Sequence, residues 1–388
     1  MRELTITLLL TAATLGFGQS FNAESFPNPS GPGSIQPNLS AAPDGSVVLS
    51  WVEPAKGGAF SLRYAVRHES KWSEPHTVAA QRHFFRHPAE MPEVVALNDH
   101  MWLAHWVEMP KEGSEAEYVY VSCSTDGVHW TEPVIAHKDR AEVEHGLVSM
   151  AASGPNEVSL MWLHTPEGED GPGYLMRTIV NASTGKEIKE ERIDSDVCAC
   201  CPTAIAKTPR GLLVAYRDHT PEDIRDISVV RFENGRWSEP KNVNPDNWKL
   251  NACPTNAAAL SAKGDRVALA WYTGSPSPRV EVVFSFDGGT TFSKPVVVST
   301  GRSFGYTSVA MNQDGSAIVS WLEQGGTAGA RVLARNVTQA GPKGPAITVA
   351  EGGRMGLGYP KLVESAEGTF ITWCDSKTSK VLTARLNK

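Results

Sequence analysis

Seven aromatic residues recur along the 388-residue chain at a nearly constant spacing of 50 to 56 residues. They are Trp51, Trp106, Trp162, Tyr216, Trp271, Trp321 and Trp373. Each ring ends a short apolar segment, as in VVLSWVE at 47–53 and AIVSWLE at 317–323. A fixed period of this length indicates that one supersecondary unit is repeated along the chain. The sequence therefore predicts a repeat architecture with seven units.

Each repeat contains short strand-like segments separated by turn residues. A first apolar segment leads to a turn such as Asp44-Gly45 or Asp314-Gly315, and the aromatic segment follows. A variable loop then leads to a third strand, such as LRYAVR at 62–67, and to a short fourth strand. Short, evenly spaced strands with turn signals between them are typical of a closed all-β array. We expect a seven-bladed β-propeller of four-stranded antiparallel blades, with a six-bladed propeller as the alternative.

The repeats form one predicted propeller domain at 21–388. They lie near 35–80, 88–137, 144–193, 200–243, 252–299, 304–349 and 356–388. The last repeat has no obvious fourth strand. The N-terminal segment 21–36 can supply it, which would close the ring.

The turns after the third strands resemble the Asp-box of the sialidase (BNR-repeat) superfamily, whose pattern is Ser-x-Asp-x-Gly-x-Thr followed by Trp or Phe. Residues 285–292, SFDGGTTF, match it fully, and 124–130, STDGVHW, are one residue short. The resemblance implies a β-propeller in which the Asp accepts backbone hydrogen bonds within the turn. The Cys-x-Cys-Cys phrase at 198–201 further resembles a group of exported bacterial sialidase-like proteins of unassigned activity.

Residues 1–20 are typical of a secretory signal peptide, with an apolar run followed by small residues. No later stretch is long and apolar enough to span a membrane. The net charge of −7 and the lack of a Lys/Arg run argue against nucleic acid as a partner. We therefore expect a periplasmic or extracellular protein, monomeric and without a membrane span.

Strand order separates two faces of the propeller. The Asp-Gly and Asp-box turns lie on one face. The links between repeats and the loops between second and third strands lie on the other, which we call the candidate face. Loops on a rigid scaffold usually carry function, so the site residues are expected on the candidate face.

The cysteines of this face are the least ordinary feature. Cys198, Cys200 and Cys201 enter repeat four, and Cys253 enters repeat five at the corresponding position. Three interpretations stay open: a disulfide such as Cys201–Cys253, a thiolate site for a soft ion such as Cu or Zn that also uses His145, and a redox dithiol. Cys123 and Cys374 are expected in the core.

Polar residues of the same face are candidates for ligand binding. Glu108 stands two residues after a repeat aromatic, and Arg217, Asp218 and His219 begin the densest polar loop. Two links share a pattern of Arg, Gly and Tyr. The further ligand-binding candidates from these links are Arg302, Tyr306, Arg354 and Tyr359.

The resemblance to sialidases implies a three-arginine clamp on a substrate carboxylate. It does not allow a nucleophile or an acid to be assigned here. The prediction is therefore an exported propeller that binds a small-molecule or glycan ligand, or a soft metal, on the candidate face. A glycoside hydrolase of the exo-α-sialidase type is the first alternative, and a protein-interaction platform is the second.

Overall fold

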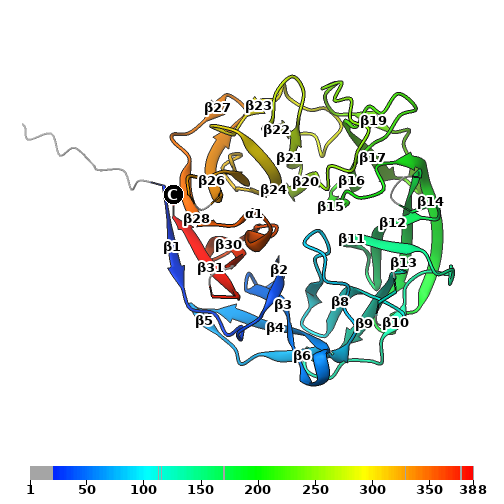
Figure 1. Cartoon of the computed structure of the whole chain (residues 1–388). Coiled ribbons are helices and arrows are strands. Elements are labelled where there is room, and N and C mark those ends of the chain that lie inside the picture. Colours follow the sequence, from blue (N-terminus) through cyan, green and yellow to red (C-terminus); the bar gives the residue numbers. More distant parts are fainter. Residues whose placement is uncertain are drawn as a thin grey trace, which may run out of the picture.

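The computed structural model describes residues 21–111, 113–114, 116–168, 171–327, 329–375 and 378–387. These residues form seven antiparallel sheets arranged as blades around a central axis (Figure 1). The predicted seven-bladed β-propeller is confirmed, and the six-bladed alternative is wrong. The predicted signal peptide, residues 1–20, lies outside the described residues.

The first three blades follow the chain from the centre outward. Blade 1 contains β2 (Ile35–Ala41), β3 (Val47–Pro54), β4 (Phe60–His68) and β5 (Lys71–Trp72), with β6 (His76–Arg82) also paired to β4. Blade 2 contains β7 (Glu93–Asn98), β8 (Met101–Glu108), β9 (Tyr118–Ser124) and β10 (Val134–Ile135). Blade 3 contains β11 (Glu144–Gly154), β12 (Glu157–Thr165), β13 (Gly173–Asn181) and β14 (Glu187–Val197).

The next three blades repeat this order. Blade 4 contains β15 (Ala204–Thr208), β16 (Gly211–Arg217), β17 (Ile227–Glu233) and β18 (Arg236–Trp237), with β19 (Lys241–Asn242) also paired to β17. Blade 5 contains β20 (Ala259–Lys263), β21 (Arg266–Thr273), β22 (Arg279–Ser285) and β23 (Val296–Val297). Blade 6 contains β24 (Ser303–Met311), β25 (Ala317–Gln324), β26 (Ala330–Thr338) and β27 (Gly341–Pro342), with β28 (Ile347–Gly352) also paired to β26.

Blade 7 is built from both ends of the chain. It contains β29 (Lys361–Ser365), β30 (Gly368–Asp375), β31 (Lys380–Asn387) and, as its outermost strand, β1 (Asn22–Phe26). The β1–β31 register runs from Asn22 opposite Asn387 to Phe26 opposite Thr383. The expected closure of the ring by the N-terminal segment is confirmed.

Helical structure is confined to two short segments of the described residues, the 3₁₀ turn Lys56–Gly58 and α1 (Arg354–Leu357), which lies near the axis in Figure 1. Neither segment has the length or the apolar composition needed to cross a lipid bilayer.

The repeated aromatics lie in the core between neighbouring blades. All seven rings are buried, and Trp271 of blade 5, for example, belongs to one core cluster with Leu213 and Val229 of blade 4. A buried indole N–H needs an acceptor. In blade 6, Trp321 donates to Glu323, two residues further along the strand, at 3.0 Å.

The Asp-box turns serve the scaffold, as the resemblance implies. In blade 2, Asp126 Oδ1 accepts the backbone N–H groups of Val128 and His129, both at 2.8 Å. Hydrogen bonds from the His129 ring and from these backbone groups hold the pKa of Asp126 well below its usual range. The equivalent Asp287 of blade 5 accepts two backbone N–H groups at 3.0 Å. These carboxylates are thus committed to their own turns.

Candidate functional site

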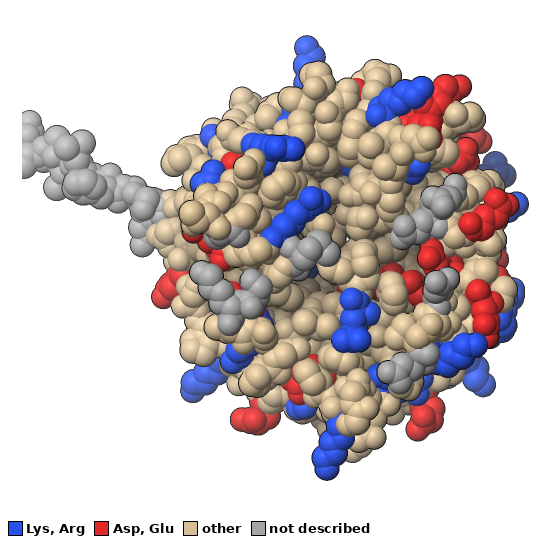
Figure 2. Space-filling model, in the orientation of Figure 1, with Lys and Arg blue, Asp and Glu red and all other residues tan. Residues whose placement is uncertain are grey.

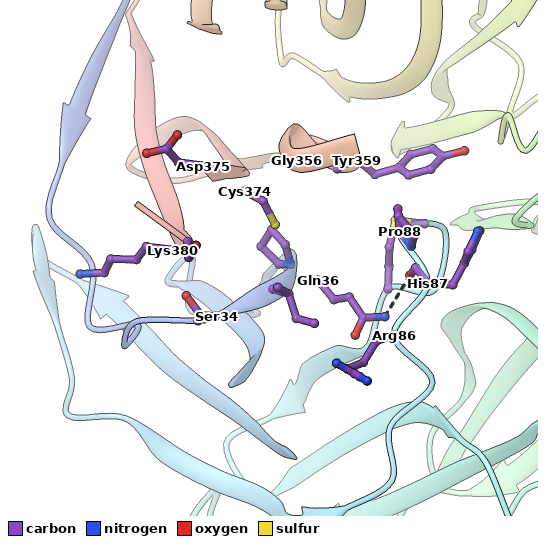
Figure 3. A pocket seen from close by; sticks show the side chains of 16 residues that line it. Ser34, Gln36, Arg86, His87, Pro88, Gly356, Tyr359, Cys374, Asp375 and Lys380 are labelled. Atoms are coloured by element: carbon purple, nitrogen blue, oxygen red, sulfur yellow. Dashed lines mark hydrogen bonds between the residues drawn. The ribbon is translucent and has the colours of Figure 1, made fainter. Parts of the chain in front are cut away.

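A cavity of about 470 Å³ lies on the candidate face between blades 1 and 7 (Figure 3). We call it the blade 1/7 cavity. Its walls come from the start of β2, the link 86–91, the segment 356–359 at and just beyond the end of α1, and the facing ends of β30 and β31. Pockets of this size hold small molecules in other proteins.

One side chain fixes the wall between blades 1 and 2. Gln36 is 7% exposed, and its Nε2 donates to the carbonyl oxygens of Phe85, His87 and Glu90 at 3.1, 3.1 and 2.7 Å. The link that carries Arg86, His87 and Pro88 is therefore tied to β2. This wall of the cavity is therefore preformed.

The cavity combines apolar and polar groups. In Figure 3 the Cys374 side chain points toward the side where Gln36 lies, whereas the Lys380 ammonium group points away. Burial raises the pKa of Cys374 to about 11, so this thiol is neutral at physiological pH. Arg86 brings a positive charge to the wall and stacks on Phe60, with its guanidinium carbon 4.5 Å from the ring centroid. Cys374 was expected in the core, and it is half-buried at the cavity wall instead.

Arg217 has a structural environment. It is 1% exposed, and its Nε, Nη1 and Nη2 donate to the carbonyl oxygens of Asn256, Arg225 and Tyr272 at 3.1, 2.6 and 2.9 Å. Its guanidinium group joins blade 4 to the link and strand of blade 5. All three nitrogens are therefore already occupied by backbone acceptors.

The two residues that follow are also held by internal contacts. Asp218 accepts the hydroxyl of Ser228 at 2.7 Å, and burial raises its pKa. The His219 ring lies between Asp196 and Asp223, at 2.6 and 3.4 Å. Contacts among its own charged and polar side chains therefore hold this loop in place.

The structure brings Tyr306, Arg354 and Tyr359 together. The two tyrosine rings are 4.5 Å apart between centroids, and Arg354 lies over Tyr306 at 5.3 Å. The Tyr359 hydroxyl donates to the Thr255 carbonyl, and burial raises its pKa well above the usual value. Arg302 and Arg354 are exposed and act electrostatically on Tyr272. Only Tyr359 of the predicted ligand-binding residues lines the blade 1/7 cavity.

Glu108 belongs to a repeated scaffold contact. It accepts the indole N–H of Trp106 and forms an ion pair with Arg82 at 2.7 Å. Blades 1 and 6 repeat this arrangement at Glu53 and Glu323. The acid two positions after the ring thus satisfies a buried tryptophan.

The cysteines converge as expected, but with a different disulfide. Cys253 is bonded to Cys200, with Cα atoms 6.0 Å apart, and not to Cys201. The expected Cys201–Cys253 pairing is wrong because Cys201 is turned into the protein. Its sulfur accepts the Asn256 N–H at 3.3 Å and lies 3.3 Å from the Cys198 sulfur. The Cys198 sulfur is also 3.8 Å from that of Cys200.

The two remaining thiols of this cluster titrate differently. The hydrogen bond with Cys201 and the positive charges of Arg217 and Arg225 lower the pKa of Cys198 to about 6. Burial and the Cys198 sulfur raise the pKa of Cys201. Cys198 is therefore the more acidic thiol of the pair.

His145 belongs to another cluster. In the described part of the chain, its potential metal-binding atom groups with those of Asp139 and His164, while Cys198 groups with Cys200 and Cys201. The prediction that joined His145 to the cysteines placed two separate clusters in one.

Sequence reasoning missed a buried acid. Glu90 lines a small second cavity of about 70 Å³ with Glu117, Glu144 and Cys200. Burial raises the pKa of Glu90 to about 7, and its carboxylate accepts the Leu147 N–H at 2.5 Å. The signal in the sequence was an acid between Pro88 and Pro92 in an otherwise apolar link.

Comparison with known proteins places the chain in a family. The profile of the BNR repeat-like domain matches residues 59–371. The chain belongs to the BNR repeat-like family. No curated protein matches this BNR repeat-like chain.

Solved structures share the fold of this BNR repeat-like protein. An ulvan lyase has a TM-score of 0.56 at 9% identity, over 92% of this chain and 95% of its own. The α-L-arabinanase of Penicillium chrysogenum has a TM-score of 0.50 at 8% identity, over 94% and 98%. A Dyadobacter fermentans protein of unknown function has a TM-score of 0.49 at 15% identity, over 95% of both chains. At such identities, the ulvan lyase and the arabinanase indicate a common fold and no more.

Proposed function

We propose that this propeller binds a saccharide or a similar polyhydroxylated small molecule in the blade 1/7 cavity. The observation that carries the proposal is the cavity itself, which is large enough for a sugar and has one wall fixed by Gln36. Apolar walls with a few polar groups suit the faces and hydroxyls of a sugar ring. The ulvan lyase and the arabinanase, each solved with a bound saccharide, make this ligand class a reasonable first choice.

Charge narrows the ligand class further. Arg86 is the cation at the fixed wall, and a guanidinium group pairs with a carboxylate through two parallel hydrogen bonds. Acidic and basic side chains are interspersed on the face seen in Figure 2, without a continuous basic patch. We therefore favour a sugar that carries a single carboxylate over a polyanion.

A glycan array followed by calorimetry tests the proposal. We expect binding of an acidic saccharide that weakens at least about tenfold in Arg86→Gln and in Cys374→Met, which adds bulk to the cavity. Lys71→Gln, an exposed residue of β5, is the control and should bind like the parent. The proposal fails if no saccharide binds, or if both cavity variants bind as well as the control.

One observation argues against a sialidase-type clamp that uses Arg217. A sialidase-type clamp requires three arginines with free guanidinium edges, and Arg217 has its nitrogens occupied by carbonyl oxygens. We expect no turnover of a fluorogenic sialoside. Turnover that is lost in both Arg302→Ala and Arg354→Ala would instead support the glycoside hydrolase.

A soft metal at the thiols is a second candidate function. Cys198 and Cys201 are buried with sulfurs 3.3 Å apart, and Cys200 is within 3.8 Å of Cys198. Thiolates favour Cu(I) and Zn(II). With Cys200 held by Cys253, two thiols remain, which suits Cu(I) better than four-coordinate Zn(II).

Anaerobic Cu(I) titration against a chromophoric chelator tests the soft-metal candidate. We expect one bound Cu(I), lost in Cys198→Ser and retained in Cys123→Ser, whose thiol is buried elsewhere in blade 2. An intact mass that shows a second disulfide, Cys198–Cys201, in the isolated protein would contradict it. The Cys200–Cys253 disulfide also supports our expectation that the protein acts outside the cytoplasm.

A further inference from the structure

Three side chains at the entrance to blade 3 meet at one point of the candidate face. Asp139 lies in the link between blades 2 and 3, while His145 and His164 are directly opposite each other on β11 and β12. Asp139 Oδ2 is 3.3 Å from His145 Nε2 and 3.6 Å from His164 Nε2. Their three potential ligand atoms lie within 4.8 Å of one another.

Hydrogen bonds fix the proton of His145 on the far side of its ring. Its Nδ1 is 2.8 Å from the Glu117 carbonyl oxygen and 3.0 Å from that of Val143. A carbonyl oxygen can only accept, so Nδ1 carries hydrogen and donates. In the neutral ring, Nε2 then presents a lone pair toward Asp139. A ring nitrogen held in this way by a backbone carbonyl is the usual support of a metal-binding histidine.

The carboxylate is oriented in the same manner. Asp139 Oδ1 accepts the Ala141 N–H at 2.9 Å, which leaves Oδ2 facing the two imidazoles. The two nearby arginines have other contacts. Arg140 donates to the Asp139 backbone carbonyl at 2.9 Å, and the guanidinium carbon of Arg192 lies 4.8 Å from the centroid of the Tyr174 ring. Within the described residues, the ion-pair partners of the Asp139 carboxylate are His145 and His164.

Two acceptors that face each other at 3.3 Å repel unless a positive charge lies between them. His145 is fully buried, so water reaches this contact only from the Asp139 side and screens the repulsion incompletely. A single cation placed among the three atoms would accept electron pairs from Asp139 Oδ2, from His145 Nε2 and from the His164 ring. The alternative is a proton, which would make an ordinary imidazolium–carboxylate pair.

We propose that Asp139, His145 and His164 bind one divalent transition-metal ion such as Zn²⁺. Two imidazoles and one carboxylate are the ligands that Zn²⁺ and its first-row neighbours share, whereas Ca²⁺ and Mg²⁺ prefer oxygen alone. The Asp139 side chain is 38% exposed and that of His164 15% exposed. The ion therefore keeps an open position toward solvent, as in sites where a metal holds water or a ligand.

The test is a Zn²⁺ titration of the full chain after chelator treatment, in a Cys198→Ser/Cys201→Ser background that excludes the thiol cluster. We expect one Zn²⁺ per chain, with affinity reduced at least about tenfold in Asp139→Asn and in His164→Asn. Cobalt substitution should give a visible spectrum without the strong thiolate-to-metal band.

His129→Asn is the matched control, because His129 is 2.7 Å from Asp126 and has no third ligand grouped with that pair among the described residues. This variant should bind Zn²⁺ like the parent. Thermal unfolding without metal shows whether each variant folds. The proposal is overturned if the folded parent binds no Zn²⁺, which leaves the proton-only cluster, or if Asp139→Asn and His164→Asn bind as tightly as the His129 control.

Discussion

Replacing Arg217 by Met separates a scaffold role from a ligand-binding role. The substitution keeps much of the side-chain volume and removes three donors, so the carbonyl oxygens of Asn256, Arg225 and Tyr272 lose their partners. A buried polar group without a partner costs about 1–3 kcal/mol. Because the desolvated charge disappears as well, we expect a net loss near 4 kcal/mol rather than the sum of the three upper values.

This loss is measurable as a shift in melting temperature. An unfolding entropy of about 2.1 cal/mol/K per residue gives roughly 0.8 kcal/mol/K for a chain of this length, so 4 kcal/mol lowers Tm by about 5 °C. Calorimetry or circular dichroism measures it. Arg210→Met is the control, because Arg210 is 43% exposed and pairs with Glu233 at the surface, where a pair contributes less than about 1 kcal/mol. A Tm within about 1 °C of the parent for Arg217→Met would refute the structural role.

The remaining predictions concern stability, and thermal or denaturant unfolding measures each of them. Deletion of β1, Asn22–Phe26, should cost about 3 kcal/mol or more through the lost packing of Phe26, and aggregation should appear in gel filtration; an unchanged Tm would mean that β1 does not close the ring. Glu90 has a pKa raised from 4.5 to about 7, so the folded state holds its proton more tightly than the unfolded state. The free energy of unfolding therefore includes the full contribution of Glu90 below pH 4.5. This contribution, up to roughly 3 kcal/mol, is lost as the pH rises to about 7. Glu90→Gln should reduce this dependence of stability on pH. Cys253→Ser opens a loop with a sequence separation of 53 and should cost about 4 kcal/mol, whereas peptide mapping that finds no Cys200–Cys253 bond would contradict the pairing.

The fold could be predicted from the sequence because the same pattern of strands and aromatic residues is repeated. Seven rings at one period, such as Trp51 and Trp321, define where each blade begins, and their burial between blades is the physical reason for the period. Ring closure also followed from the sequence, because a missing strand at one end and a spare segment at the other have a single solution. In a repeat architecture, the contacts of each unit with its neighbours determine the overall fold.

The candidate site was less predictable, because its residues meet through loops whose paths the period does not specify. His145 and the cysteines enter neighbouring blades on the same face, yet their potential ligand atoms form two separate groups. Asp139 carried no motif, and its meaning depends on the cross-strand pair of His145 and His164. Arg217 was predicted to bind a ligand because it begins a polar loop. In the structure it is buried among carbonyl oxygens instead.

The outermost strand of blade 7 has a consequence for how the molecule is made. β1 is synthesised before all the other strands and its partner β31 after them. During synthesis, residues 22–26 therefore have no sheet edge to join, while the first six blades already possess all their strands. The ring stays open until β31 emerges. Because the two strands then lie side by side, a short linker could join residues 22 and 387, and new ends could be cut into an Asp-box turn to give a circular permutant whose last blade is covalently continuous.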